Sequence, residues 1–144
     1  MFDVKRFSLP DPALAEPAFA IRREVFVREQ GIDAALEYDH EEAARHYLLF
    51  FDGRPIATAR WRETGSGIKL ERFAVLAPFR RRGVGAGLLR EVLRDVVPLG
   101  KTIYLHSQLR AVPFYERNGF SKVGDPFAEA GIAHFKMQWP TTDH

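Results

Sequence analysis

The chain has 144 residues, enough for one compact domain and few for two. Its hydrophobic fraction of 46% and charged fraction of 28% are typical of a soluble globular protein, and no apolar run approaches the ~18 residues of a membrane span. A formal charge of only +2 gives no reason to expect nucleic-acid binding, and the absence of cysteine excludes disulfides, thiolate-bound zinc and a cysteinyl nucleophile. Because the N-terminus lacks the apolar core of a secretory signal, we expect a cytoplasmic protein with no membrane or nucleic-acid partner.

The first predicted elements are a strand and a helix. We expect Phe2–Phe7 to form the strand. Asp11 followed by Pro12 is typical of a helix start, because aspartate caps free amides and proline needs no amide partner there. Apolar residues then recur at helical spacing. Pro17 is unfavourable inside a helix, so a start nearer Glu16 is an alternative.

The middle of the chain predicts an antiparallel meander. Asp52 and Gly53 are a hairpin signal, because glycine tolerates the positive φ that a tight turn requires. A second glycine-containing break follows the next apolar stretch. We therefore expect three strands, at His46–Phe51, Ile56–Trp61 and Ile68–Val75.

The second half of the chain alternates helices and strands. The apolar stripe after the glycine-rich segment has helical spacing, and later breaks separate shorter elements. No internal repeat or linker is visible, so the sequence predicts one α+β domain over residues 1–144. The expected elements are a helix to about Val97, strand Thr102–Ser107, helix Ala111–Asn118, and strands Phe120–Val123 and Ala133–Trp139.

Arg80–Gly87 has the composition of a phosphate-binding helix start. The first amides of a helix lack internal partners, glycine lets an anion approach them, and arginine adds fixed charge. The segment is not a P-loop, since no Gly-Lys-Ser or Gly-Lys-Thr occurs. It is not a dinucleotide fingerprint either, because Leu88 stands where the third glycine would be. Its pattern is Arg80-x-x-Gly83-x-Gly85.

This pattern resembles the coenzyme A loop of the GNAT superfamily of N-acetyltransferases. The strand Leu70–Val75 before it, the amphipathic helix after it, and the later Phe114-Tyr115-x-x-x-Gly119-Phe120 element are in the order that the family shows. The resemblance implies an α/β/α sandwich-like fold with a mixed, mostly antiparallel sheet of six to seven strands. It also implies about four flanking helices and a splay between the fourth and fifth strands.

The resemblance assigns roles to residues along this half of the chain. Tyr115 corresponds to the tyrosine that protonates the departing thiolate, and a backbone amide of Ala74 or Val75 to the oxyanion donor. Acetyl-CoA is the implied cosubstrate, with no metal. The expected cofactor-binding residues are Phe73, Ala74, Val75, Arg80, Arg81, Arg82, Gly83, Val84, Gly85, Ala86, Gln108 and Phe114.

The general base has three candidates. Glu71 is expected on the central strand, pointing to the same side as Phe73 and Val75, although it could instead pair with an arginine of the neighbouring strand. His106 lies at the end of the next strand and has an imidazole of suitable unperturbed pKa. Water could also carry the proton.

The first helix and the acidic segment after it resemble the ElaA/YjcF-like branch of the superfamily. The segment at residues 32–45 is predicted to be a loop that can contain one helical turn at Glu41–Ala44, and an acidic loop would favour a cationic amine. Its cluster from Asp39 to Glu42 lacks the spacing of a metal site. The expected acceptor contacts are Arg22, Glu29, Gln30, Asp39 and His46, with His40 a further candidate.

The sequence thus predicts direct transfer of acetyl from acetyl-CoA to a primary amine of a small molecule or peptide, in a ternary complex. Without cysteine, a cysteinyl acyl-enzyme is impossible. The alternatives are a non-catalytic acyl-CoA-binding or regulatory module and a transferase of a longer acyl group. Either a monomer or a homodimer is compatible with the sequence.

Overall fold

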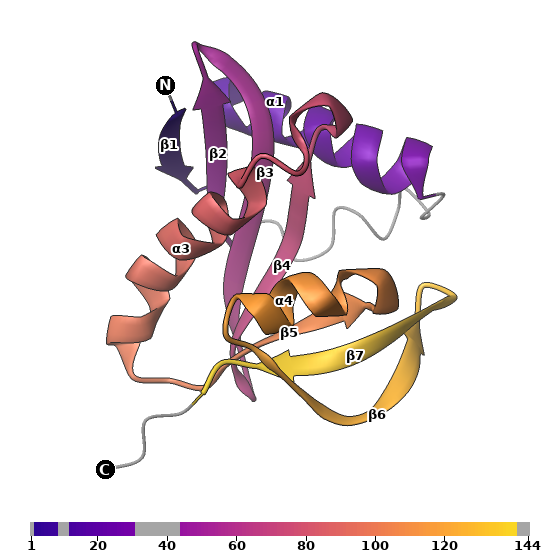
Figure 1. Cartoon of the computed structure of the whole chain (residues 1–144). Helices are drawn as coiled ribbons and strands as arrows, with labels where there is room; N and C mark the ends of the chain where they lie inside the picture. The colour runs from indigo at the N-terminus through magenta and orange to yellow at the C-terminus, as the bar shows by residue number, and fades with distance from the viewer. Residues whose placement is uncertain (1, 9–11, 31–43, 141–144) are drawn as a thin grey trace.

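A computed structural model describes residues 2–8, 12–30 and 44–140, which form one sheet with helices on both of its faces (Figure 1). The strands are β1 (Phe2–Phe7), β2 (Arg45–Phe51), β3 (Arg54–Thr64), β4 (Gly67–Val75), β5 (Ile103–Gln108), β6 (Ser121–Glu129) and β7 (Ile132–Gln138). The α-helices are α1 (Pro12–Arg22), α3 (Val84–Val96) and α4 (Val112–Arg117). A π-helix, η1 (Arg23–Glu29), continues α1, and short 3-10 turns are η3 (Ala77–Phe79), η4 (Val97–Leu99) and η5 (Leu109–Ala111).

The seven strands lie in the order β1-β2-β3-β4-β5-β7-β6. Every neighbouring pair is antiparallel except β4 and β5, which are parallel. The mixed, mostly antiparallel sheet expected from the sequence is therefore confirmed. No helix among the described residues is long and apolar enough to cross a membrane.

The first helix begins at Pro12, so the alternative start near Glu16 is wrong, and Pro17 lies inside α1 without ending it. The apolar face of α1 packs against one side of the sheet, where Ala18 and Ile21 are buried together with Leu48 of β2. We call this side the α1 face. The predicted hairpin at Asp52 is also present, with positive φ at that residue and at the glycine after it.

The opposite side of the sheet, here called the α3 face, carries the larger core. The stripe of α3 that periodicity predicts is buried there, with Leu88, Val92 and Val96 completely enclosed. Helix α4 packs on the same face through Val112 and Phe114. In Figure 1, α3 and α4 lie in front of the sheet and α1 behind it.

Strands β4 and β5 pair only at their beginnings and then separate. Ile68, Lys69 and Leu70 of β4 lie opposite Ile103, Tyr104 and Leu105 of β5, and no later residue of β4 pairs with β5 in the described structure. The predicted splay is thus confirmed. It leaves the second half of β4 with one edge that pairs with no strand of the described structure.

A bulge at Arg72 changes the side of the sheet to which the side chains of β4 point, and it corrects the prediction that Glu71 points to the same side as Phe73 and Val75. Arg60 pairs with Glu71 and Thr58 with Ala74, so β4 has one residue more than β3 over this stretch. Arg72 has a φ of 58°, in the left-handed region that arginine rarely adopts. Because of the extra residue, Glu71 points to the α1 face, opposite to Phe73 and Val75.

The last two strands form a hairpin that is longer than predicted. We expected a strand to end at Val123, because the glycine, aspartate and proline that follow usually interrupt strands. Instead β6 continues to Glu129 past an irregularity between Val123 and Phe127. An edge strand tolerates such a bulge, since its outer side needs no partner. The extension carries Glu129 toward the end of β5.

Candidate active site

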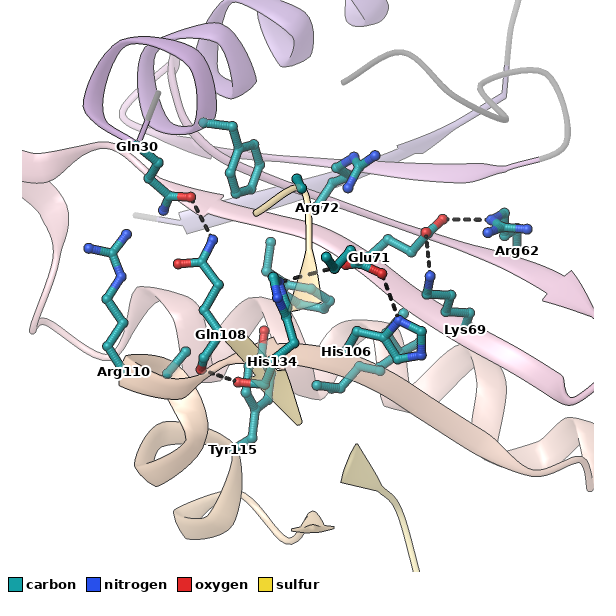
Figure 2. A pocket seen from close by; sticks show the side chains of 18 residues that line it. Gln30, Arg62, Lys69, Glu71, Arg72, His106, Gln108, Arg110, Tyr115 and His134 are labelled. Carbon is teal, nitrogen blue, oxygen red and sulfur yellow. Dashed lines mark hydrogen bonds and ion pairs between the residues drawn. The ribbon is translucent and has the colours of Figure 1, made fainter. Parts of the chain in front are cut away.

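A pocket of about 420 Å³ lies where β4 and β5 separate (Figure 2). Glu71, His106 and Gln108 reach it from the α1 face, and Tyr115 reaches it from α4 on the α3 face. The pocket therefore passes through the sheet. A donor held on one side and an acceptor held on the other could meet inside it.

Tyr115 lines this pocket from α4, the α-helix that follows β5. Its ring is fixed by edge-to-face contacts with Phe73, Phe114 and Phe120, with centroids 5.0–6.4 Å away. No described residue hydrogen-bonds to its hydroxyl, which leaves that group for a ligand. Burial raises the pKa of the Tyr115 phenol above its ordinary value, so the hydroxyl keeps its proton at neutral pH.

Glu71 also lines the pocket, but three cations surround its carboxylate. Its Oε1 lies 3.2 Å from Arg60 and 2.8 Å from Arg62, and its Oε2 lies 3.4 Å from Lys69. Burial opposes ionisation of Glu71, but these cations outweigh it and lower the pKa of the carboxyl. A carboxylate held this way is a weak base. The pairing with arginines of β3 that the sequence left open is present.

His106 and a second histidine share one carboxylate that the sequence did not single out. His106 Nδ1 lies 3.0 Å from Oε1 of Glu129, and Nε2 of His134 lies 3.6 Å from Oε2. The hydrogen bond from His106 lowers the pKa of Glu129 to about 2. Only the strand order β5-β7-β6 brings these three side chains together, so no local motif marks them.

The last residues of the first helix connect both sides of the splay. Glu29 pairs with Arg80 of the glycine-rich loop, at 2.8 and 2.9 Å, and Gln30 accepts a 2.7 Å hydrogen bond from Gln108 of β5. Figure 2 shows Gln30, Gln108 and Arg110 at one end of the pocket, away from Arg62. These contacts lie at the end of the π-helix η1, and π-helical turns are frequent at functional sites.

The glycine-rich loop leads into the N-terminus of α3. Gly83 is the N-terminal cap residue in a left-handed conformation, and no side chain of the described residues caps the helix. The first helical hydrogen bond comes from the amide of Gly87, so the preceding amides have no helical partner. Arg81 and Arg82 beside them are exposed. This geometry suits a phosphate group.

Two glycines of α3 have different surroundings. A Cβ at Gly85 would lie 3.4 Å from the ring of Phe114, so the loop packs closely on α4. Among the described residues, a Cβ at Gly87 would meet only the end of the Arg90 side chain. The small residue at Gly85 therefore sets the distance between the loop and the helix that carries Tyr115.

The backbone of β4 has further hydrogen-bond donors, amides that point into the space between β4 and β5. The amide of Leu76 bonds to β3, and because amides alternate along a strand, those of Phe73 and Val75 point the other way. The side chain of Ala74 is buried on the α1 face. Arg80 Nε donates to the Val75 carbonyl at 2.8 Å, so Arg80 is bound to β4 and Glu29.

Three expected acceptor contacts do not line the pocket: Arg22, Glu29 and His46. Glu29 pairs with Arg80 instead. Arg22 and His46 are both 1% exposed, and His46 stacks on Phe7 with centroids 5.0 Å apart. Asp39, His40 and the acidic loop lie outside the described residues. Within the described part of the chain, no group of three or more acidic or histidine side chains could hold a metal ion.

Comparisons with known proteins agree with this geometry. A family model for the acetyltransferase (GNAT) domain matches residues 12–141. The uncharacterized N-acetyltransferase YjcF of Bacillus subtilis (strain 168) is 36% identical over 123 residues, covering 83% of this chain and 88% of YjcF. The chain belongs to the GNAT acetyltransferase family.

Solved structures show the same fold. Escherichia coli ElaA superposes with a TM-score of 0.86 at 23% identity, over 96% of this chain and 99% of ElaA. A GNAT family acetyltransferase from Elizabethkingia anophelis, solved with acetyl-CoA bound, superposes with a TM-score of 0.68 at 14% identity, over 95% and 94% of the two chains. The predicted relationship to ElaA and YjcF is confirmed.

Proposed function

We propose that this chain binds acetyl-CoA and transfers the acetyl group directly to a primary amine. The observation that carries this proposal is the pocket through the sheet, which brings Tyr115 from one face together with Glu71 and His106 from the other. The exposed start of α3 beside it supports the binding of coenzyme A. We further propose that residues 1–144 form a single domain.

In the proposed complex, the pyrophosphate binds at the free amides before Gly87, with Arg81 and Arg82 nearby. Pantetheine lies along the free edge of β4 and pairs with the backbone of Phe73 and Val75. The thioester then reaches the pocket from the α3 face. This path is supported by the direction of the β4 amides and by the close packing of Gly85 on Phe114.

The reaction needs three groups around the thioester. The amine nitrogen attacks the carbonyl carbon, and a β4 amide, that of Val75 by its direction, stabilises the oxyanion. The carbon–sulfur bond then breaks, the sulfur takes the proton of Tyr115, and the Tyr115 phenolate regains a proton from water. The proton that the amine loses goes to the base or to water. The products are the N-acetyl compound and free coenzyme A.

For the base, we favour His106 over Glu71. Arg60, Arg62 and Lys69 stabilise the ionised form of Glu71, so its carboxylate is a poor proton acceptor. His106 has one ring nitrogen bonded to Glu129 and the other without a hydrogen-bond partner among the described residues. Water remains the alternative carrier.

The charged residues that line the pocket indicate which class of amine could bind as the acceptor. The described lining has four cations, Arg62, Lys69, Arg72 and Arg110, against two carboxylates, Glu71 and Glu129. This favours an amine that carries an acidic group, whereas the acidic sequence at residues 32–45 favours a cationic amine. A useful substrate panel must therefore contain both kinds.

The test is thiol release from acetyl-CoA in the presence of amino acids, polyamines, aminoglycosides and lysine peptides, with the acetylated product identified by mass spectrometry. Amine-dependent release of coenzyme A is expected. Tight coenzyme binding without release for any amine would instead support a non-catalytic acyl-CoA-binding module. Release only with longer acyl-CoA donors would support the other alternative.

A further inference from the structure

Glu129 lies at the end of β6, 23 residues from His106 in sequence but in direct contact with it. Its side chain bonds to His106 through Oε1 and faces His134 through Oε2. The carboxylate is partly exposed, at 41%, and it borders the pocket. It is therefore close enough to the acceptor space to matter for the reaction.

The contact determines which nitrogen of His106 carries hydrogen. An ionised carboxylate can only accept a hydrogen bond, so the Nδ1 atom of His106, 3.0 Å from Oε1, is the donor. In a neutral imidazole the proton on Nδ1 leaves Nε2 with a lone pair. Nε2 has no hydrogen-bond partner among the described residues, and His106 lines the pocket.

Packing holds this ring in place from other directions. Phe127 of β6 contacts the His106 ring edge to face, with centroids 4.9 Å apart, and Tyr104 lies 5.9 Å away on β5. His134 donates through Nδ1 to the Ile132 carbonyl at 2.7 Å, which fixes the second histidine beside Glu129. The ring of His106 is thus oriented by several strands at once.

The charged surroundings of the pair come from three strands. Lys136 on β7 lies directly opposite His106 in the sheet register, and His134 lies on the same strand. Lys69 on β4 acts on Glu129 through space. Glu129 on β6 is the carboxylate that contacts the His106 ring. It is therefore the group that can offset a positive charge formed on that ring.

We propose that Glu129 is a positioning residue, which holds the Nδ1–H of His106 so that Nε2 faces the acceptor amine as the proton acceptor. This inference rests on the proposed function. As the amine nitrogen bonds to the acetyl carbon, its N–H bond breaks and the proton moves to Nε2. The resulting imidazolium stays bonded to Glu129, and the proton leaves to water after the product departs.

The first test reads the tautomer directly and does not depend on activity. Nitrogen-15 NMR of the imidazoles, assigned with His106→Gln and His134→Gln, reports which ring nitrogen is protonated at pH 8. We expect His106 to carry its proton on Nδ1 in the natural protein and to lose that preference in Glu129→Gln. Glu63→Gln, which removes an exposed carboxylate paired with Lys101, is the matched control and should change nothing.

The second test is kinetic. Glu129→Gln should lower kcat at least tenfold with little change in the acceptor KM, whereas Glu129→Asp should recover part of the loss. In the His106→Gln background, Glu129→Gln should have no further effect, because the two residues act as one unit. Equal additional losses in both backgrounds would overturn the proposal.

The outcomes separate this inference from the proposed function. An Nε2–H tautomer of His106 in the natural protein, or an unchanged tautomer in Glu129→Gln, overturns the inference whatever the activity. Full activity of His106→Gln also overturns it, while leaving acetyl transfer through Tyr115 intact. Failure of every amine to release thiol would instead contradict the proposed function, and the NMR result would still decide whether Glu129 sets the tautomer.

Discussion

The guanidinium of Arg80 binds the carboxylate of Glu29 through both terminal nitrogens, at 2.8 and 2.9 Å. The same guanidinium donates from Nε to the carbonyl of Val75. One side chain thus connects the glycine-rich loop to the end of the first helix and to the second half of β4. The sequence predicted that Arg80 lies near the phosphates of the coenzyme. In the structure, the guanidinium of Arg80 is instead paired with Glu29.

Removing Glu29 tests whether it competes with the coenzyme. Glu29→Gln should free Arg80 for the pyrophosphate and tighten coenzyme A binding. Because the pair is partly exposed, its strength is about 0.2–1 kcal/mol, which corresponds to a change of up to about fivefold in Kd. Isothermal titration calorimetry measures it. Glu24→Gln, which breaks the exposed pair with Arg28 one turn earlier, is the control. Weaker binding in Glu29→Gln would show that the ion pair orders the loop for the coenzyme.

The carboxylate of Glu71 should matter for stability more than for proton transfer. Glu71→Gln leaves Arg60, Arg62 and Lys69 without their shared anion in a buried setting, and a loss of about 3 kcal/mol in the free energy of unfolding is expected. Urea unfolding at pH 7 measures this loss. An unchanged midpoint would contradict the electrostatic account of the cluster.

The same variant has a defined pH dependence. Since the pKa of Glu71 is lower in the folded than in the unfolded protein, its stabilisation is complete above the unfolded pKa and is lost as the pH falls through the folded pKa. The stability difference between the natural protein and Glu71→Gln should therefore shrink on acidification below about pH 4.3, the ordinary glutamate pKa. Unfolding curves at several pH values test this, and a difference that grows toward acid pH would contradict it.

Gly85 and Gly87 offer a matched pair within α3. Gly85→Val should displace Phe114, destabilise the protein by about 1–3 kcal/mol through overpacking, and weaken coenzyme A binding. Gly87→Val adds the same side chain at a position where, in the described part of the chain, the flexible end of Arg90 is the one neighbour, so little change is expected. Urea unfolding and calorimetric Kd values for both variants provide the comparison. Equal effects would show that contact with Phe114 is unimportant.

Local patterns predicted most of the fold. The apolar stripe of α3 and the turn at Asp52 have short-range causes, periodicity and positive φ, and both are present. The side of the sheet to which Glu71 points was predicted wrongly. The bulge has its positive φ at Arg72, and no glycine stands there to indicate a bulge in the sequence. The long β6 was missed for the opposite reason, since residues that usually end a strand lie within it.

From the sequence, candidate site residues could be predicted only where they belong to one contiguous motif. Tyr115 and the glycine-rich loop are contiguous motifs; Tyr115 lines the pocket at the splay, and the loop packs on Phe114 of α4 at Gly85. Glu129 and His134 come near His106 through the order of three strands, which residue spacing does not reveal. The pairing of Arg80 with Glu29 spans 51 positions and has the same cause.

Tyr115→Phe is the most direct test of the central claim, that a thiolate leaving into this pocket takes its proton from Tyr115. With an acceptor found in the screen, we expect amine-dependent thiol release to fall by about 10²-fold or more, as for loss of a general acid, while the Kd for acetyl-CoA changes less than twofold. Tyr104→Phe is the control, because Tyr104 bonds to Thr64 outside the pocket lining and should keep full activity. Thiol release by Tyr115→Phe at the rate of the natural protein would contradict the account.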